Sequence, residues 1–151
     1  MNSMERVATT LQHMWSDMEG DLVSELSDVI REEGGLVMIH NCGERVYFDA
    51  QIEYMKPASI SLLYPPDDCN DFAECNEKYG DKVTLIGCVT PVHAAFSSDE
   101  EWDKECMNRV DDMSKGGGFI LATGCEYPAN VSFAKALRMV NIAKTYGRYL
   151  Q

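Results

Sequence analysis

Two patterns of apolar residues alternate along the chain. Residues 22–30 carry apolar side chains at three- and four-residue steps with acidic residues between them, and Gly34-Gly35 follows, which predicts an amphipathic helix. An unbroken apolar run from Leu36 to Ile39 comes next and predicts a strand. Segments of these two kinds then keep alternating towards the end of the chain.

The remaining elements follow from the same patterns. Ser98 and Glu101 fit a capping box, and Thr90-Pro91 predicts a loop. Expected strands cover residues 36–42, 59–64, 82–89 and 118–125; expected helices cover residues 46–55, 71–79, 98–113 and 132–149, with a weakly patterned helical segment at residues 4–19. One apolar stripe is expected to face the core: Trp102, Cys106, Val110 and Met113. The last helix is expected to carry a second apolar stripe on one face: Phe133, Ala136, Leu137, Val140 and Ala143.

Four strands that alternate with helices, joined by short connections, predict parallel β-α units. Right-handed crossovers place the carboxyl ends of all four strands at one edge of the sheet. Five residues stand at such ends: His40, Cys42, Tyr64, Cys88 and Cys125. In (β/α)8 barrels the catalytic groups gather at this edge.

The first and last strands each end in residue types that bind metals. Successive side chains of a strand point to opposite faces, so His40 and Cys42 leave the first strand on the same side. Cys125 follows a glycine at the end of the last strand. One imidazole and two thiolates suit zinc, and three protein ligands with an open fourth position describe a catalytic zinc site. The alternative is that all three are ordinary strand residues, because free cysteine is among the most buried residue types.

The chain of 151 residues has room for about half of a (β/α)8 barrel, which takes about 250 residues. An open half-sheet would leave two parallel edges unpaired, and proteins avoid such edges. We therefore expect an α/β fold, the C-terminal half of a TIM barrel with parallel strands and outer helices over residues 21–151, after a helical extension over residues 1–20. The N-terminal half-barrel would come from a second copy, a separate partner or a longer chain.

Composition narrows the function classes. Hydrophobic residues make up 45% of the chain and charged residues 25%, as in globular proteins. No apolar run approaches the roughly 18 residues of a membrane span and no signal-peptide layout is present, so a cytoplasmic location is expected. A net charge of -12 argues against a nucleic-acid partner. The six cysteines are then expected to be reduced thiols or metal ligands.

Three motifs resemble those of a known family. They are residues 39–43 (IHNCG), residues 83–91 (VTLIGCVTP) and residues 117–128 (GGFILATGCEYP). Together they resemble the C-terminal half of the uroporphyrinogen decarboxylase superfamily, and most closely its corrinoid-dependent methyltransferases, typified by methylcobamide:coenzyme M methyltransferase. The His-x-Cys pair with the distant Gly-Cys is the most specific part of a resemblance that covers roughly residues 20–150.

This resemblance implies a zinc ion held by His40, Cys42 and Cys125. It also implies transfer of a methyl group from a methylcobamide, carried by a corrinoid protein, to a small thiol such as coenzyme M. Zinc would bind that thiol as its thiolate, since a thiol with a pKa near ~8.5 is mostly protonated at neutral pH. No other side chain is assigned to the chemical step.

Two neighbouring residues are candidates for supporting the ligands. The family often has Gly-Asn-Val-Asp-Pro where residues 87–91 read GCVTP, which places Cys88 near the expected site and leaves its role open. Glu126 follows Cys125 and would orient a ligand or accept a proton, although a solvated carboxylate is the simpler interpretation.

Two other functions remain open. A decarboxylase-like enzyme that acts on a tetrapyrrole carboxylate without metal would need a cationic pocket, and only Arg45 follows a strand end. Decarboxylases of the superfamily also typically have a histidine where this chain has Cys125. The second alternative is a non-catalytic half-barrel subunit that pairs with a partner or binds a corrinoid protein.

The remaining polar candidates have simpler explanations. Asp67 and Asp68 lie in a Pro-Pro-Asp-Asp loop, which is typical of a turn before a helix. His93 is expected to be an exposed loop residue, and His13 on the weak N-terminal helix has no role in the site.

Overall fold

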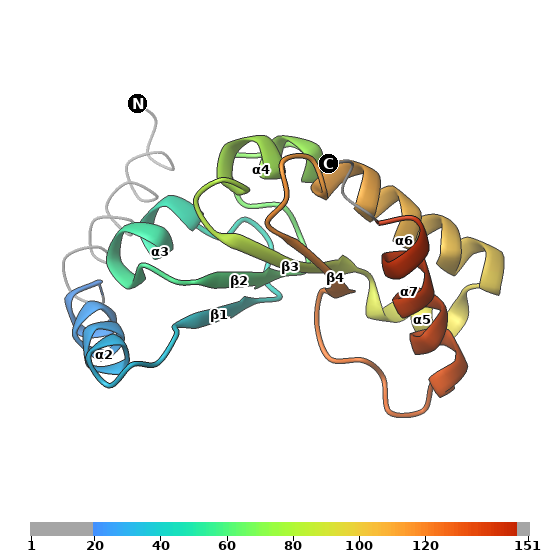
Figure 1. Ribbon diagram of the computed structural model, residues 1–151, viewed down its shortest axis with the longest axis horizontal. Helices are drawn as coiled ribbons and strands as arrows, with labels where there is room; N and C mark the ends of the chain where they lie inside the picture. The colour runs from blue at the N-terminus through green and yellow to red at the C-terminus, as the bar shows by residue number, and fades with distance from the viewer. Residues whose placement is uncertain (1–19, 148–151) are drawn as a thin grey trace, which may run out of the picture. The chain divides into compact units, whose positions relative to one another are not determined.

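The computed structural model describes residues 20–147, which fall into two compact units (Figure 1). The first unit holds α2 (Gly20–Glu32) and α3 (Phe48–Met55), and the second holds the sheet and the other helices. The helix expected at residues 4–19, with His13, lies outside the described residues, as does all of the expected extension except Gly20. None of the helices between residues 20 and 147 combines the length and apolar character needed to cross a membrane.

The first unit is held together by a close contact and a hydrogen bond between its two helices. Gly20 lies against the ring of Tyr54, where a Cβ would come within 2.9 Å of ring carbons. Nη1 of Arg31 donates to the carbonyl oxygen of Met55 over 2.7 Å. The apolar stripe of α2 is exposed in the described structure; its members are Leu22, Leu26 and Val29.

The second unit is built on a parallel sheet in the order β1-β2-β3-β4. Its strands are β1 (Met38–Asn41), β2 (Ser59–Leu62), β3 (Thr84–Val89) and β4 (Phe119–Thr123). Four parallel strands alternating with helices confirm the expected α/β half-barrel. Their carboxyl ends form one edge, called here the rim, which consists of residues 40–43, 62–64, 88–90 and 123–125.

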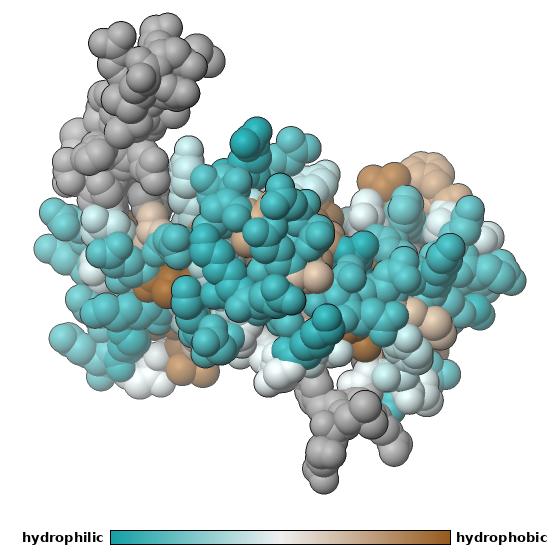
Figure 2. Space-filling model, turned by 90° about the horizontal axis from the view of Figure 1, so that it is seen from above, coloured by the Kyte–Doolittle hydropathy of each residue, from teal (hydrophilic) through white to brown (hydrophobic). Residues whose placement is uncertain are grey.

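Helices cover one face of the sheet. α4 (Phe72–Tyr79) and α6 (Asp99–Met113) lie over it, and α7 (Phe133–Thr145) packs beside α6 (Figure 1). Ile60, Leu62 and Leu85 are fully buried on this covered face. The core stripe predicted on α6 is confirmed: Trp102, Cys106, Val110 and Met113 are all buried. Seen from the side of α4 and α6, the outer surface is mainly hydrophilic (Figure 2).

The opposite face of the sheet, called here the inner face, carries Met38, His40, Ser61, Ile86 and Ile120, which the strand register places side by side. Met38 is 68% exposed and Ile120 is 52% exposed. Among the described helices of this unit, none is drawn over the inner face in Figure 1. In a closed barrel this face would line the interior.

The loop expected at Thr90-Pro91 and His93 was wrong in part. Pro91 begins a short helix, α5 (Pro91–Phe96), because its backbone angle is already suited to the first position of a helix. The capping box of Ser98 and Glu101 at the start of α6 is confirmed.

The apolar stripe expected on one face of α7 is not the face by which the helix docks. Phe133, Leu137 and Val140 are 74%, 52% and 42% exposed, whereas Ile142 is buried. Ile142 packs with Trp102 and Cys106 of α6, and Arg138 of α7 forms an ion pair with Asp103 of α6. These contacts turn the helix so that its docking face is shifted from the one that the periodicity favoured.

Candidate metal centre

His40 and Cys42 stand together at the carboxyl end of β1. His40 lies on the inner face, where the parallel register places it opposite Ser61 of β2. Nδ1 of His40 is 3.2 Å from Oγ of Ser61. Cys42 comes directly after the strand, and both His40 and Cys42 are exposed to solvent.

Cys125 leaves the carboxyl end of β4 in a tightly held turn. The amide of Gly124 donates to the carbonyl oxygen of Val89 over 2.8 Å, which extends the pairing of β4 with β3 by one residue. The hydroxyl of Thr123 donates to the carbonyl oxygen of Cys125 over 2.7 Å. These two hydrogen bonds fix the backbone on both sides of Cys125, whose side chain is half-buried.

The structure brings these three side chains together although β1 and β4 are the outer strands of the sheet. Neighbouring strands lie about 4.8 Å apart, so three steps across a flat sheet would separate them by roughly 14 Å. The ligand atoms of His40, Cys42 and Cys125 nevertheless all lie within 4.8 Å of one another. The sheet therefore curls at the rim until its first and last strands present their side chains to one point.

Two glycines make this curl sterically feasible. A Cβ on Gly124 would stand 2.6 Å from Cα of Leu63 and 2.8 Å from the carbonyl oxygen of Leu62, both at the end of β2. Gly87 on the intervening strand has a φ of +120°, and a Cβ there would stand 2.6 Å from the same carbonyl oxygen. The backbone of β4 thus reaches the end of β2 past a residue that has no side chain.

The donor set and its spacing fit zinc. Tetrahedral zinc with bonds of about 2.3 Å to sulfur and 2.0–2.1 Å to nitrogen holds its ligand atoms about 3.5–3.8 Å apart. Small side-chain rotations would bring the three atoms from their present spacing, within 4.8 Å, to these distances. Because His40 and Cys42 are exposed, a fourth position would face solvent and could take a substrate.

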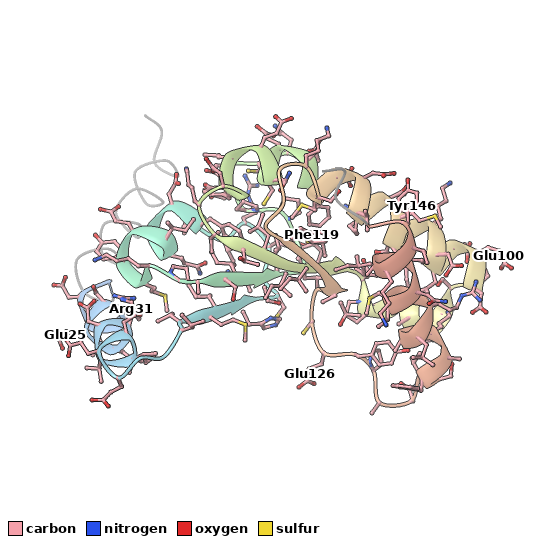
Figure 3. The ribbon with its side chains drawn as sticks, viewed as in Figure 1. Glu25, Arg31, Glu100, Phe119, Glu126 and Tyr146 are labelled. Carbon is pink, nitrogen blue, oxygen red and sulfur yellow. The ribbon has the colours of Figure 1, made fainter. Side chains whose placement is uncertain are left out.

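The two candidates for supporting the ligands lie elsewhere. Cys88 is 1% exposed. Burial of its thiol is the main cause that raises its pKa well above the ordinary value, and the neighbouring Cys75 raises the pKa further. Alternation would have placed Cys88 on the inner face, but left-handed backbone angles at Gly87 and Cys88 interrupt the alternation. Glu126 is exposed, and Figure 3 shows its side chain on the loop after β4, directed away from the strands.

Other thiols of the chain are desolvated. Burial raises the pKa of Cys69, Cys75 and Cys106 to about 12. A thiol of this kind is a poor nucleophile and a poor metal ligand at neutral pH. Among the described residues, only His40, Cys42 and Cys125 group closely enough to hold a metal ion.

The remaining polar candidates serve local structure. Asp68 accepts hydrogen bonds from Lys78 and from the hydroxyl of Tyr79, which ties the loop after β2 to α4. His93 belongs to α5 rather than to a loop, and its Nδ1 lies 2.6 Å from a carboxylate oxygen of Glu105 on α6. The same carboxylate accepts from the amide of Thr90 over 2.8 Å.

Sequence reasoning did not identify Ser61 or Thr123 as parts of the site, and it noted Gly124 only as the residue before Cys125. The alternation of Ser59, Ile60 and Ser61 on β2 could have indicated that Ser61 faces the same side of the sheet as Ser59. No local pattern indicated the role of Gly124, because the atoms that Gly124 approaches lie about sixty residues away in the chain, at Leu62 and Leu63.

Comparison with known proteins gives one assignment. A search of curated proteins found no match to this chain. The family model for uroporphyrinogen decarboxylase (URO-D) matches residues 9–146, which include every described strand and all three residues of the candidate metal centre. The chain belongs to the uroporphyrinogen decarboxylase (URO-D) family.

Proposed function

We propose that this chain provides the zinc site of a corrinoid-dependent methyltransferase whose acceptor is a small thiol such as coenzyme M. The observation that carries the proposal is the convergence of one imidazole and two thiols, within 4.8 Å, at an exposed rim. His40, Cys42 and Cys125 would hold the metal. When bound there, zinc keeps a substrate sulfur in its thiolate form at neutral pH.

The overall reaction is balanced without further reagents. The acceptor thiol loses its proton to solvent, and its sulfur forms a bond to the methyl group of the methylcobamide. The carbon–cobalt bond breaks with its electron pair left on the corrinoid, which a corrinoid protein would present to the rim. The exposure of His40 and Cys42 leaves that side of the site open to both substrates.

The proposal includes a second half-barrel. In the described chain, β1 pairs with β2 and β4 pairs with β3, so each outer strand has a free edge. The exposed Met38 and Ile120 add apolar surface on the inner face. We propose that, in a sample of this chain alone, a second copy covers Met38, Ile120 and the two strand edges and leaves the rim open, because free parallel edges and apolar faces favour association.

Metal analysis of the purified chain tests the function. We expect about one equivalent of zinc in the native chain and in a Cys69→Ala control, which removes a half-buried thiol away from the cluster. His40→Ala, Cys42→Ala and Cys125→Ala should each lose most of the zinc. Formation of the methyl thioether from methylcobalamin and 2-mercaptoethanesulfonate should fall with the zinc content.

The result also separates the alternatives. A native chain that binds no zinc but consumes a tetrapyrrole carboxylate would replace the proposal with a decarboxylase-like activity. A chain that keeps its full zinc content after Cys125→Ala would remove Cys125 from the ligand set and overturn the proposed site.

A further inference from the structure

Ser61 contacts His40, one of the proposed zinc ligands, and the proposed function gives this contact no role. Its strand, β2, lies between β1 and the rest of the sheet, and the register places it directly opposite His40. Oγ of Ser61 is 3.2 Å from Nδ1 of His40, and both side chains lie on the inner face. Ser61 therefore contacts Nδ1, and the other ring nitrogen of His40, Nε2, is the one that could bind a metal ion.

The two ring nitrogens of a neutral histidine have different roles. One carries a proton and donates, while the other has a lone pair that can bind a metal. If Nδ1 carries the proton, it donates to the Ser61 hydroxyl and Nε2 presents its lone pair. In metal sites, a partner of the non-ligating nitrogen fixes both the tautomer and the orientation of the ring.

We infer that Ser61 is a positioning residue for the metal centre, one that holds His40 in the Nδ1–H tautomer with Nε2 directed at the ion. The inference rests on the proposed zinc site and adds one residue to it. His40 needs such a partner because it is exposed, so the packing around its ring does little to fix the ring plane. The strand pairing supplies a rigid support for the hydroxyl, since β1 and β2 are hydrogen-bonded neighbours.

The chain contains a matched control on the same strand. Ser59 lies two residues before Ser61, so it is on the same face, but its register partner is Met38, which has no ring nitrogen. Both serines are half-buried. Ser59→Ala therefore removes a hydroxyl from an equivalent place without touching His40, and Ser61→Thr keeps a hydroxyl at the position under test.

The first measurement is zinc affinity by competition with a chromophoric chelator. We expect Ser61→Ala to bind zinc about 10–100-fold more weakly than the native chain. Ser59→Ala should match the native chain, and Ser61→Thr should recover most of the loss. A native-like affinity for Ser61→Ala would overturn the inference.

The second measurement does not require metal. Nitrogen-15 spectra of the metal-free native chain should show His40 protonated at Nδ1, with its signals assigned by their loss in His40→Gln. Ser61→Ala should lose this preference, and Ser59→Ala should keep it. A His40 ring protonated at Nε2 in the native chain would refute the inference even if zinc binds, whereas a native chain with the expected tautomer and no zinc would refute the proposed function alone.

Discussion

Gly124 at the end of β4 lies against Leu63 at the end of β2, so close that a Cβ on Gly124 would stand 2.6 Å from Cα of Leu63. The contact joins two strands that are not neighbours in the sheet, since β3 lies between them. Cys125 is the next residue, so the position of its sulfur depends directly on this approach. The candidate metal centre therefore depends on a position where a side chain has no room.

We predict that Gly124→Ala weakens zinc binding and stability together. The added methyl group meets backbone atoms that cannot rotate away, so β4 must shift outward and carry Cys125 with it. Overpacking of this kind costs about 1–3 kcal/mol of unfolding free energy. Urea denaturation and zinc competition on the same sample measure the two effects.

Gly43→Ala is the control for that experiment. Gly43 is also next to a ligand residue, Cys42, but a Cβ there would meet Cγ1 of Val46 at 3.9 Å, an ordinary contact. This variant should keep native stability and zinc affinity. Equal losses in both variants would show that any methyl group near the ligands is harmful, and would contradict the role given to the contact between Gly124 and Leu63.

The Asp68–Tyr79 hydrogen bond predicts a pH dependence of stability. Burial alone would raise the pKa of Asp68, but hydrogen bonds from Lys78 and Tyr79 outweigh it and lower the pKa below its ordinary value. The contribution of ionised Asp68 is therefore complete above the ordinary carboxyl pKa near ~4. It is lost as the pH falls through the lower pKa of the folded state.

Tyr79→Phe tests this prediction. The Tyr79 hydroxyl donates to the Asp68 carboxylate over 2.6 Å, and its removal should cost about 1–2 kcal/mol of unfolding free energy at pH 7. On acidification, the variant should then lose less unfolding free energy than the native chain does. Tyr146→Phe removes an exposed hydroxyl that donates to Asp111, and it should have a smaller effect. If the native chain and Tyr79→Phe lose the same unfolding free energy on acidification, the assignment to Asp68 is disproved.

The exposed inner face predicts self-association through one side of the sheet. Ile120 on the inner face and Leu137 on the outer helix α7 are each 52% exposed, so they form a matched pair. Ile120→Glu should shift the chain towards monomer, because a carboxylate cannot be buried in an apolar contact without a partner. Leu137→Glu should leave the mass in sedimentation equilibrium unchanged. A folded native monomer at all concentrations would contradict the proposed pairing.

Much of the candidate site could be read from local sequence. The His-x-Cys spacing placed His40 and Cys42 on one side of a strand end, and the structure has both at the rim. The Gly-Cys at the end of β4 supplied the third thiol. Cys88 shows where such reasoning stops, because two consecutive residues with positive φ interrupt the two-residue alternation on which its expected position depended.

The sequence by itself determined the four strands, the helices between them and the buried stripe of α6, because periodicity and capping are properties of neighbouring residues. Only the tertiary structure decided which face of α7 is buried and that Ser61 stands beside His40. It also decided that the sulfur of Cys125 reaches the imidazole of His40 across two intervening strands. Those relationships depend on how far the sheet curls at its rim, and the curl is set by glycine contacts between segments that are distant in the chain.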